Sequence, residues 1–172
     1  GATNDHAMRD FTLPLPWLGK NQTGESGFRF VRIDFLEPNS EIHIREMRAV
    51  ATFRDVPYVG TFKSSDERLN KIWDVGAYTV HVNMQDFLWD GIKRDRLIWS
   101  GDLNPEILTC LYMFGDNANV PNALSALRDS TPADKWMSEI PSYSAWWVLN
   151  LCEYCRFTGN MEFYRKNRDY AA

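Results

Sequence analysis

Hydrophobic and polar residues alternate in the N-terminal third of the chain. Over residues 28–37 and 41–54, apolar side chains fall mostly on every second position, with a phase slip inside the first run. This period is typical of antiparallel strands with one buried face, and phase slips indicate β-bulges. The pattern predicts two β-strands joined by a turn at residues 38–40.

After Gly60 the period changes to that of α-helices. Ser64 lies three residues before Glu67, a spacing typical of a capping box at a helix start. Gly115 and Gly159 follow apolar runs and are the expected helix ends. The pattern predicts helices over about 66–85, 102–114, 121–128 and 142–158, and from 161 onward.

The expected fold class is therefore α+β, with N-terminal β-strands followed by antiparallel helical hairpins. Two or three strands are too few to form a β-sandwich, and the last predicted helix is cut short by the end of the chain. We therefore expect an internal piece of a larger protein. The expected domains are residues 1–60, the end of a β domain with a linker, and residues 61–172, the start of a helical domain.

The composition and net charge of the chain exclude several classes of protein and of binding partner. The 172 residues are 44 % hydrophobic and carry a net charge of −4, which excludes a disordered tail. A chain without a basic excess does not predict nucleic acid as a partner. The longest apolar run, residues 107–114, is too short to cross a bilayer, so no membrane partner is expected. The three cysteines, with Cys152 and Cys155 in a predicted helix, are interpreted as buried structural thiols that bind no metal.

The most unusual composition lies in residues 86–102, between two predicted helices. Four carboxylates, three cations and two tryptophans fall within these 17 residues. Carboxylates suit acid–base chemistry, and tryptophan faces suit the apolar faces of sugar rings. A solvated loop with ion pairs among its own side chains is the alternative interpretation.

The order of these residues is more specific than their composition. The pattern Asp90-x4-Asp95-x3-Trp99-x2-Asp102, with Arg94 before the central acid, resembles the bacterial α-L-rhamnosidases of glycoside hydrolase family 78. Residues 60–73 and 140–160 are similar to the flanks of this motif in the family. The resemblance implies a β-sandwich edge that leads into an (α/α) six-hairpin barrel.

The resemblance also implies an activity, the hydrolysis of terminal α-L-rhamnosides with inversion. Asp95 falls where the family has its general acid. Asp90, Arg94, Trp99 and Asp102 fall where the family contacts the sugar. A rhamnose-containing glycoside or polysaccharide is the expected partner, with no metal and no organic cofactor.

Two departures from the family matter. Its acid is usually Glu, and Asp95 is one methylene shorter. Its general base comes from a helix far downstream, so we expect the base to lie outside this chain. The isolated chain is therefore expected to be inactive and to form a homo-oligomer through exposed helix faces.

Other functions remain open on this sequence. The chain is alternatively a non-catalytic carbohydrate-binding or interaction module of the same fold, or a six-hairpin glycosidase with another sugar specificity. The sequence leaves the compartment open between bacterial cytoplasm and periplasm.

Overall fold

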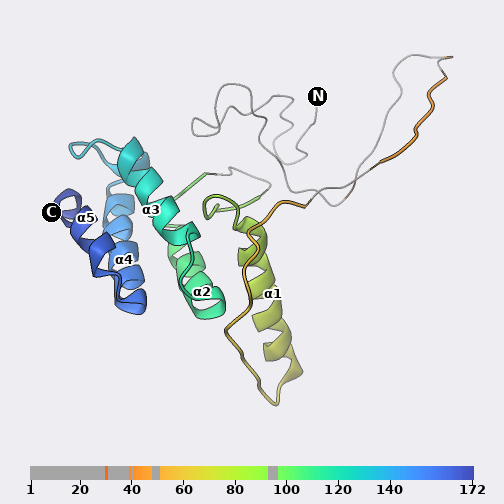
Figure 1. Cartoon of the computed structure of the whole chain (residues 1–172), viewed down its shortest axis with the longest axis horizontal. Helices are drawn as coiled ribbons and strands as arrows, with labels where there is room; N and C mark the ends of the chain where they lie inside the picture. The colour runs from red at the N-terminus through yellow and green to blue at the C-terminus, as the bar shows by residue number, and fades with distance from the viewer. Residues whose placement is uncertain (1–29, 31–38, 40, 48–50, 93–96) are drawn as a thin grey trace. The chain divides into compact units, whose positions relative to one another are not determined.

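The computed structural model describes residues 30, 39, 41–47, 51–92 and 97–172. The chain divides into two units, Gly1–Thr52 with Ile92–Arg94, and Phe53–Gly91 with Asp95–Ala172. The described residues of the first unit contain no helix or strand. Those of the second form α1 (Glu67–Asn83), α2 (Leu103–Phe114), α3 (Asn119–Ser130), the short 3-10 helix η1 (Met137–Glu139), α4 (Pro141–Thr158) and α5 (Met161–Ala171), as Figure 1 shows.

The expected α+β class is wrong for the part of the chain that the structure describes, because this part is helical and has no strand. Within the two predicted strands, the described residues are 30, 41–47 and 51–54, and none forms a β-ladder. Ile42 and Ile44, which should have shared a buried face, are 54 % and 53 % exposed. Alternation produces a strand only where a neighbouring strand accepts its hydrogen bonds and a core covers its apolar face. The other residues of the predicted strands lie outside the described ranges.

Residues 53–60 instead run along the helices. The amide of Arg54 donates to the carbonyl of Met84 at 2.5 Å, just past the end of α1. The amides of Val59 and Gly60 both donate to the carbonyl of Met113 in α2. These bonds satisfy the backbone of this segment through helix-end carbonyls rather than through a sheet.

The helical predictions are confirmed, with small changes at the ends. Gly115 and Gly159 end α2 and α4 with φ of 69° and 71°, backbone angles that favour glycine. The predicted cap of the first helix is wrong: Asp66, not Ser64, is the N-cap, and its carboxylate accepts from the Arg68 amide at 2.9 Å. The hydroxyl of Ser64 accepts from the amide of Asp66 instead.

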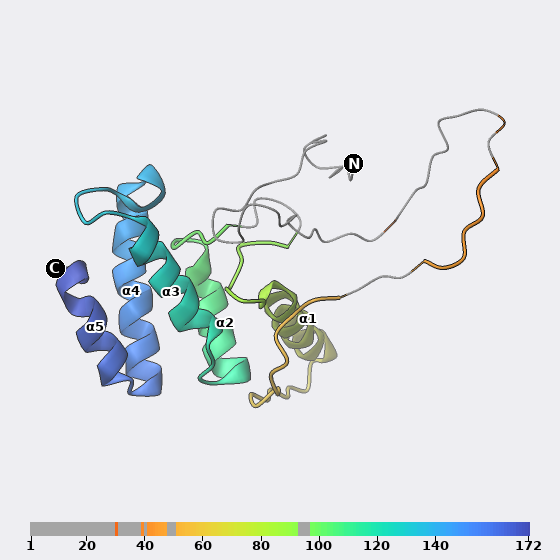
Figure 2. The ribbon, with the colours of Figure 1, turned by 45° about the horizontal axis from the view of Figure 1, so that its top comes forward.

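Helix α4 is the centre of the packing. It contacts α2, α3, α5 and η1, whereas α1 packs mainly on α2. Figures 1 and 2 show α4 with α5 on one side and α3 and α2 on the other, with α1 beyond α2. The largest fully buried side chains include Trp89, Leu103, Ile107, Leu111, Leu124, Trp147, Leu151 and Tyr154.

Helix α1 leaves Leu69 and Ile72 46 % and 65 % exposed. Within the described part of the fold, α1 packs mainly on α2. One expectation about burial is corrected. Cys110 and Cys155 are buried free thiols, but Cys152 is exposed.

Buried asparagines provide the polar links between these helices. Asn119, at the start of α3, donates to the carbonyls of Gln85 and Phe87 at 2.7 and 3.1 Å. Asn150 of α4 donates to the carbonyl of Ser100 at 2.7 Å. Both asparagines are fully buried. An irregular segment leaves carbonyls without ladder partners, so these amides satisfy groups that would otherwise be buried unpaired.

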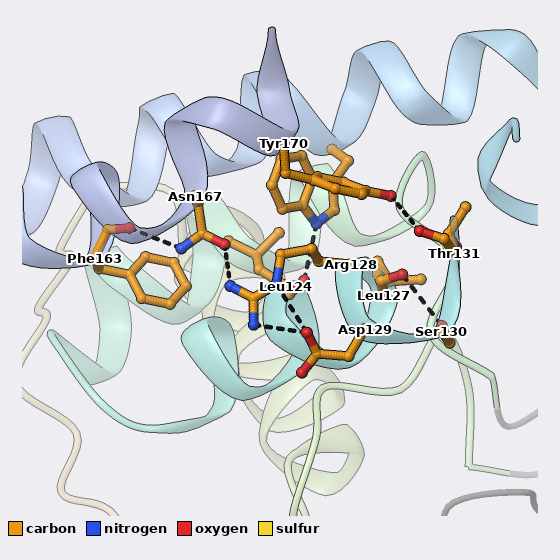
Figure 3. Close-up of polar contacts among 10 residues, drawn as sticks. Leu124, Leu127, Arg128, Asp129, Ser130, Thr131, Phe163, Asn167 and Tyr170 are labelled. Carbon is orange, nitrogen blue, oxygen red and sulfur yellow. Dashed lines mark hydrogen bonds and ion pairs between the residues drawn. The ribbon is translucent and has the colours of Figure 1, made fainter. Parts of the chain in front are cut away.

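A third buried amide holds the last helix. Asn167 of α5 accepts from the Arg128 guanidinium at 2.6 Å and donates to the Phe163 carbonyl at 2.7 Å (Figure 3). Nearby, the Tyr170 hydroxyl donates to the carbonyl of Thr131. These contacts join α5 to the end of α3.

Replacing Asn119 with alanine is expected to destabilise the fold strongly. Asn119→Ala removes its hydrogen bonds to the carbonyls of Gln85 and Phe87 and the bond that its Oδ1 accepts from the Arg54 guanidinium, each worth about 0.5–1.5 kcal/mol. We expect the free energy of unfolding in urea to fall by about 2–4 kcal/mol. The control is Asn122→Ala, which removes an exposed amide that donates to the carbonyl of Asp86 at 3.1 Å. Equal losses in the two variants would contradict this role of Asn119.

Candidate active site

The segment between α1 and α2 starts with a tight turn built on Trp89. The Trp89 amide donates to the carbonyl of Asn83 at 3.1 Å, and its indole N–H donates to Oε1 of Gln85 at 3.1 Å. Met84 and Leu88 form an isolated antiparallel bridge inside this turn. Trp89 is only 1 % exposed, so the indole anchors the turn in the core.

Asp90 follows this anchor directly and bonds to Leu97. The Asp90 amide donates to the carbonyl of Leu97 at 3.1 Å, and the Leu97 amide donates to Oδ1 of Asp90 at 2.9 Å. The two bonds tie together the ends of the six-residue stretch that contains the predicted acid. The structure therefore holds Asp90 by its backbone and by its carboxylate.

Asp102 stands at the N-cap position of α2, but its side chain caps no amide. The first two helical amides, of Leu103 and Asn104, donate to the carbonyls of Trp99 and Gly101 instead. The carboxylate of Asp102 accepts from the hydroxyl of Tyr143, with Oδ2 at 2.6 Å. Asp102 is thereby linked to the first turn of α4.

Tyr143 contacts several residues of the segment that precedes α2. Its ring meets the Trp99 indole edge to face, with ring centroids 5.8 Å apart. A Cβ at Gly101 would lie 2.6 Å from the Tyr143 ring, so only glycine allows this approach. The Ser100 hydroxyl donates to the Tyr143 carbonyl at 2.6 Å.

Glu106 is a buried carboxyl one turn along α2 from Asp102. Asn83 donates to its Oε1 at 3.0 Å, and its Oε2 is buried with no hydrogen-bond partner in the described part of the chain. Burial raises the pKa of Glu106 to about 7; the Asn83 bond opposes this shift, and the charges of Asp90 and Asp102 add to it. Glu106 therefore holds a proton well above the usual range of a carboxyl.

The charges that act on Glu106 also act on Tyr143. Its hydrogen bond to Asp102 raises the pKa of the phenol, and the charges of Asp102 and Asp90 act in the same direction. The charges of Asp90 and Asp102 thus act on both Glu106 and Tyr143. The site is acidic, and its hydrogen-bond acceptors suit neutral hydroxyl groups better than anions.

The structure describes three of the five predicted site residues. Trp99 and Asp102 both contact Tyr143, and the charge of Asp90 acts on the Tyr143 phenol, while Arg94 and Asp95 lie outside the described residues. The indole N–H of Trp99 is buried and has no hydrogen-bond partner among the residues that the structure describes. The roles of all five residues in sugar binding and catalysis stay predictions.

The sequence interpretation missed two residues of this neighbourhood. Glu106 follows Asp102 by four positions, and this spacing on a predicted helix places both on one face, so a signal was present. Tyr143 lies 41 residues after Asp102 in sequence. No local pattern predicts their contact, because it depends on how α4 packs against α2.

The described residues also bear on metal and membrane binding. Nowhere in that part of the chain do three His, Cys, Asp or Glu side chains come together to hold a metal ion. The search for membrane spans covered the same residues and found no helix with the length and apolar character to cross a bilayer.

A comparison with known protein families identifies the family of this chain. Residues 57–161 match the profile of the bacterial alpha-L-rhamnosidase 6 hairpin glycosidase domain. The chain belongs to this family. The match covers α1 to α4 with the whole 84–102 segment, and it confirms the resemblance inferred from the motif. No curated protein matches the chain significantly. A glycosidase domain of this family acts as a glycoside hydrolase, and its substrate in general is a glycoside.

The buried carboxyl makes the stability of this glycosidase domain pH-dependent. The unfolded chain releases the Glu106 proton near the ordinary value of 4.5, whereas the folded protein keeps it to about pH 7. Between these values the unfolded state binds fewer protons, so the free energy of unfolding falls as the pH rises. We expect Glu106→Gln to remove about 2–3 kcal/mol of this decline.

The measurement is urea unfolding at several pH values between 4.5 and 8. Glu162→Gln, which removes an exposed glutamate in the first turn of α5, is the matched control. A wild-type decline that persists in Glu106→Gln would show that another group causes it.

Proposed function

We propose that the protein hydrolyses terminal α-L-rhamnosides with inversion of the anomeric configuration. The observation that carries this proposal is the family match over residues 57–161, which contains the complete pattern from Asp90 to Asp102. Membership alone supports a glycoside substrate. The rhamnoside and the stereochemistry rest on the similarity of the motif to the family of α-L-rhamnosidases.

In this proposal Asp95 is the general acid. An inverting glycosidase uses one carboxylic acid to protonate the leaving oxygen, and a second carboxylate, about 6.5–9.5 Å away, activates water. Asp95 must therefore be protonated before the reaction. The adjacent Arg94 and Arg96 favour its ionised form, while burial or nearby carboxylates would favour the protonated form.

Asp90, Arg94, Trp99 and Asp102 are proposed to bind the sugar. The contacts of Tyr143 support this for two of them, because Asp102 and Trp99 both touch its side chain, and the charge of Asp90 acts on the same phenol. Carboxylates accept hydrogen bonds from hydroxyl groups, and an indole presents an apolar surface to a sugar ring. The hydrogen bonds between Asp90 and Leu97 hold Asp90 itself in place on the backbone and on its carboxylate.

A second candidate is a carbohydrate-binding module that keeps the sugar contacts without hydrolysis. The aspartate at position 95 favours this candidate, because the family usually has the longer glutamate. A displacement of about 1 Å in a catalytic group can reduce the rate about 100-fold. The two candidates differ in turnover and agree in sugar binding.

The proposed acid is tested with Asp95→Asn in the full-length protein. An amide cannot donate the proton, so we expect kcat for a rhamnoside with a poor leaving group to fall by about 100- to 10,000-fold. A nitrophenolate leaving group needs less protonation and should recover part of this loss. The measurement is kcat for aryl α-L-rhamnosides with leaving groups of graded pKa.

The outcomes separate the candidates. Equal losses with good and poor leaving groups would mean that Asp95 is not the acid. A wild-type protein that binds L-rhamnose but hydrolyses no rhamnoside would favour the binding module. Hydrolysis of other glycosides alone would indicate a different sugar specificity.

A further inference from the structure

We propose that Tyr143 is a positioning residue of this site, which orients the carboxylate of Asp102 and the indole of Trp99 toward the sugar. This inference rests on the proposed sugar-binding role of the site. Tyr143 lies in the first turn of α4, on a different helix from the residues that it would orient. It contacts one through its hydroxyl and the other through its ring.

The first argument is that Asp102 is released from helix capping. An N-cap aspartate normally accepts from the second or third helical amide. Here the second amide, of Asn104, already donates to Gly101, and the third residue is Pro105, which has no N–H. The carboxylate therefore has no amide to cap and is available for another partner.

The second argument concerns what remains of that carboxylate. Among the described residues, Tyr143 alone donates a hydrogen bond to Asp102, and it uses Oδ2. Asp102 is exposed, so Oδ1 is left to accept from a ligand hydroxyl. The bond from Tyr143 holds Oδ2, and because the carboxylate is rigid, it also fixes the direction in which Oδ1 points.

The third argument is that Tyr143 is itself held in place. Its amide donates to the carbonyl of Ile140 at 2.9 Å, and its carbonyl accepts from the Ser100 hydroxyl at 2.6 Å. The absence of a side chain at Gly101 lets the ring lie directly against the chain beside Asp102. The backbone of Tyr143 is thus held by two hydrogen bonds, and its ring packs against Gly101 and Trp99. A phenol held in this way can orient a carboxylate with little further loss of conformational entropy when a ligand binds.

The fourth argument is electrostatic. A lysine or arginine at this place would neutralise Asp102, whereas a phenol donates a hydrogen bond and leaves the negative charge. The hydrogen bond to Asp102 raises the pKa of Tyr143, and the charges of Asp102 and Asp90 add to this shift, so the phenol stays protonated. The pair therefore remains an oriented acceptor for hydroxyl groups over the neutral pH range.

The chain offers a matched control at the other end of the same helix pair. Tyr154 of α4 donates to Oδ1 of Asp116, just after α2, at 2.9 Å. This pair has the same chemistry and joins the same two helices. It contains none of the proposed site residues, so it separates a structural role from a positioning role.

The experiment is a double-mutant cycle in the full-length protein. The variants are Tyr143→Phe, Asp102→Asn, the double variant, and Tyr154→Phe as the control. The measurements are kcat and KM for a chromogenic α-L-rhamnoside, together with the melting temperature of each variant.

We expect Tyr143→Phe to raise KM about tenfold, with little change in kcat or melting temperature, because the lost bond orients an exposed carboxylate. In the Asp102→Asn background the same change should have almost no further effect, because Tyr143 acts through Asp102. Tyr154→Phe should leave KM and kcat unchanged, whatever its effect on melting.

Three results would overturn the inference. They are an unchanged KM in Tyr143→Phe, losses for Tyr143→Phe and Asp102→Asn that simply add, and an equal rise of KM in Tyr154→Phe. A wild-type protein that hydrolyses another glycoside would refute the rhamnoside alone, and the cycle measured with that glycoside would still decide on Tyr143. A wild-type protein that neither binds nor hydrolyses any glycoside would refute both proposals.

Discussion

The described structure depends on buried amide side chains that satisfy the irregular segment between α1 and α2. This segment has no sheet to pair with, so its carbonyls need donors from elsewhere. Asn119 of α3 and Asn150 of α4 provide them, at the beginning and at the end of the segment. Loss of these donors would cost the segment its hydrogen bonds to α3 and α4 and would destabilise the packing of the two helices against it.

The same constraint explains why the site includes α4. Asn150 and Tyr143 are seven residues apart, which places them on one face of the helix. Asn150 holds the carbonyl of Ser100, and the Ser100 hydroxyl donates to the carbonyl of Tyr143. Loop and helix thus hold each other, and the Tyr143 hydroxyl reaches Asp102 from a fixed position. Structure and proposed function share one set of contacts.

The charge of the site follows from its partners. The charges of Asp90 and Asp102 act on Glu106, and the described groups bonded to Asp102 and Glu106 are the neutral side chains of Tyr143 and Asn83. Burial keeps a proton on Glu106 to about pH 7, which limits the repulsion among the three carboxyls. The neutral donor Tyr143 leaves the charge on Asp102, which can then accept a hydrogen bond from a hydroxyl group of the proposed glycoside.

The sequence by itself determined the helical segments, because the apolar period and the glycines at 115 and 159 act locally. It also determined the family, because the order of residues from Asp90 to Asp102 is specific. The alternation of apolar residues over 41–47 could not decide whether a strand forms there. It produces a strand only where a neighbouring strand and a core are present to pair with and cover it. Tyr143, the partner of Asp102, was decided by tertiary structure alone, because helix packing joins residues far apart in sequence and leaves no local pattern.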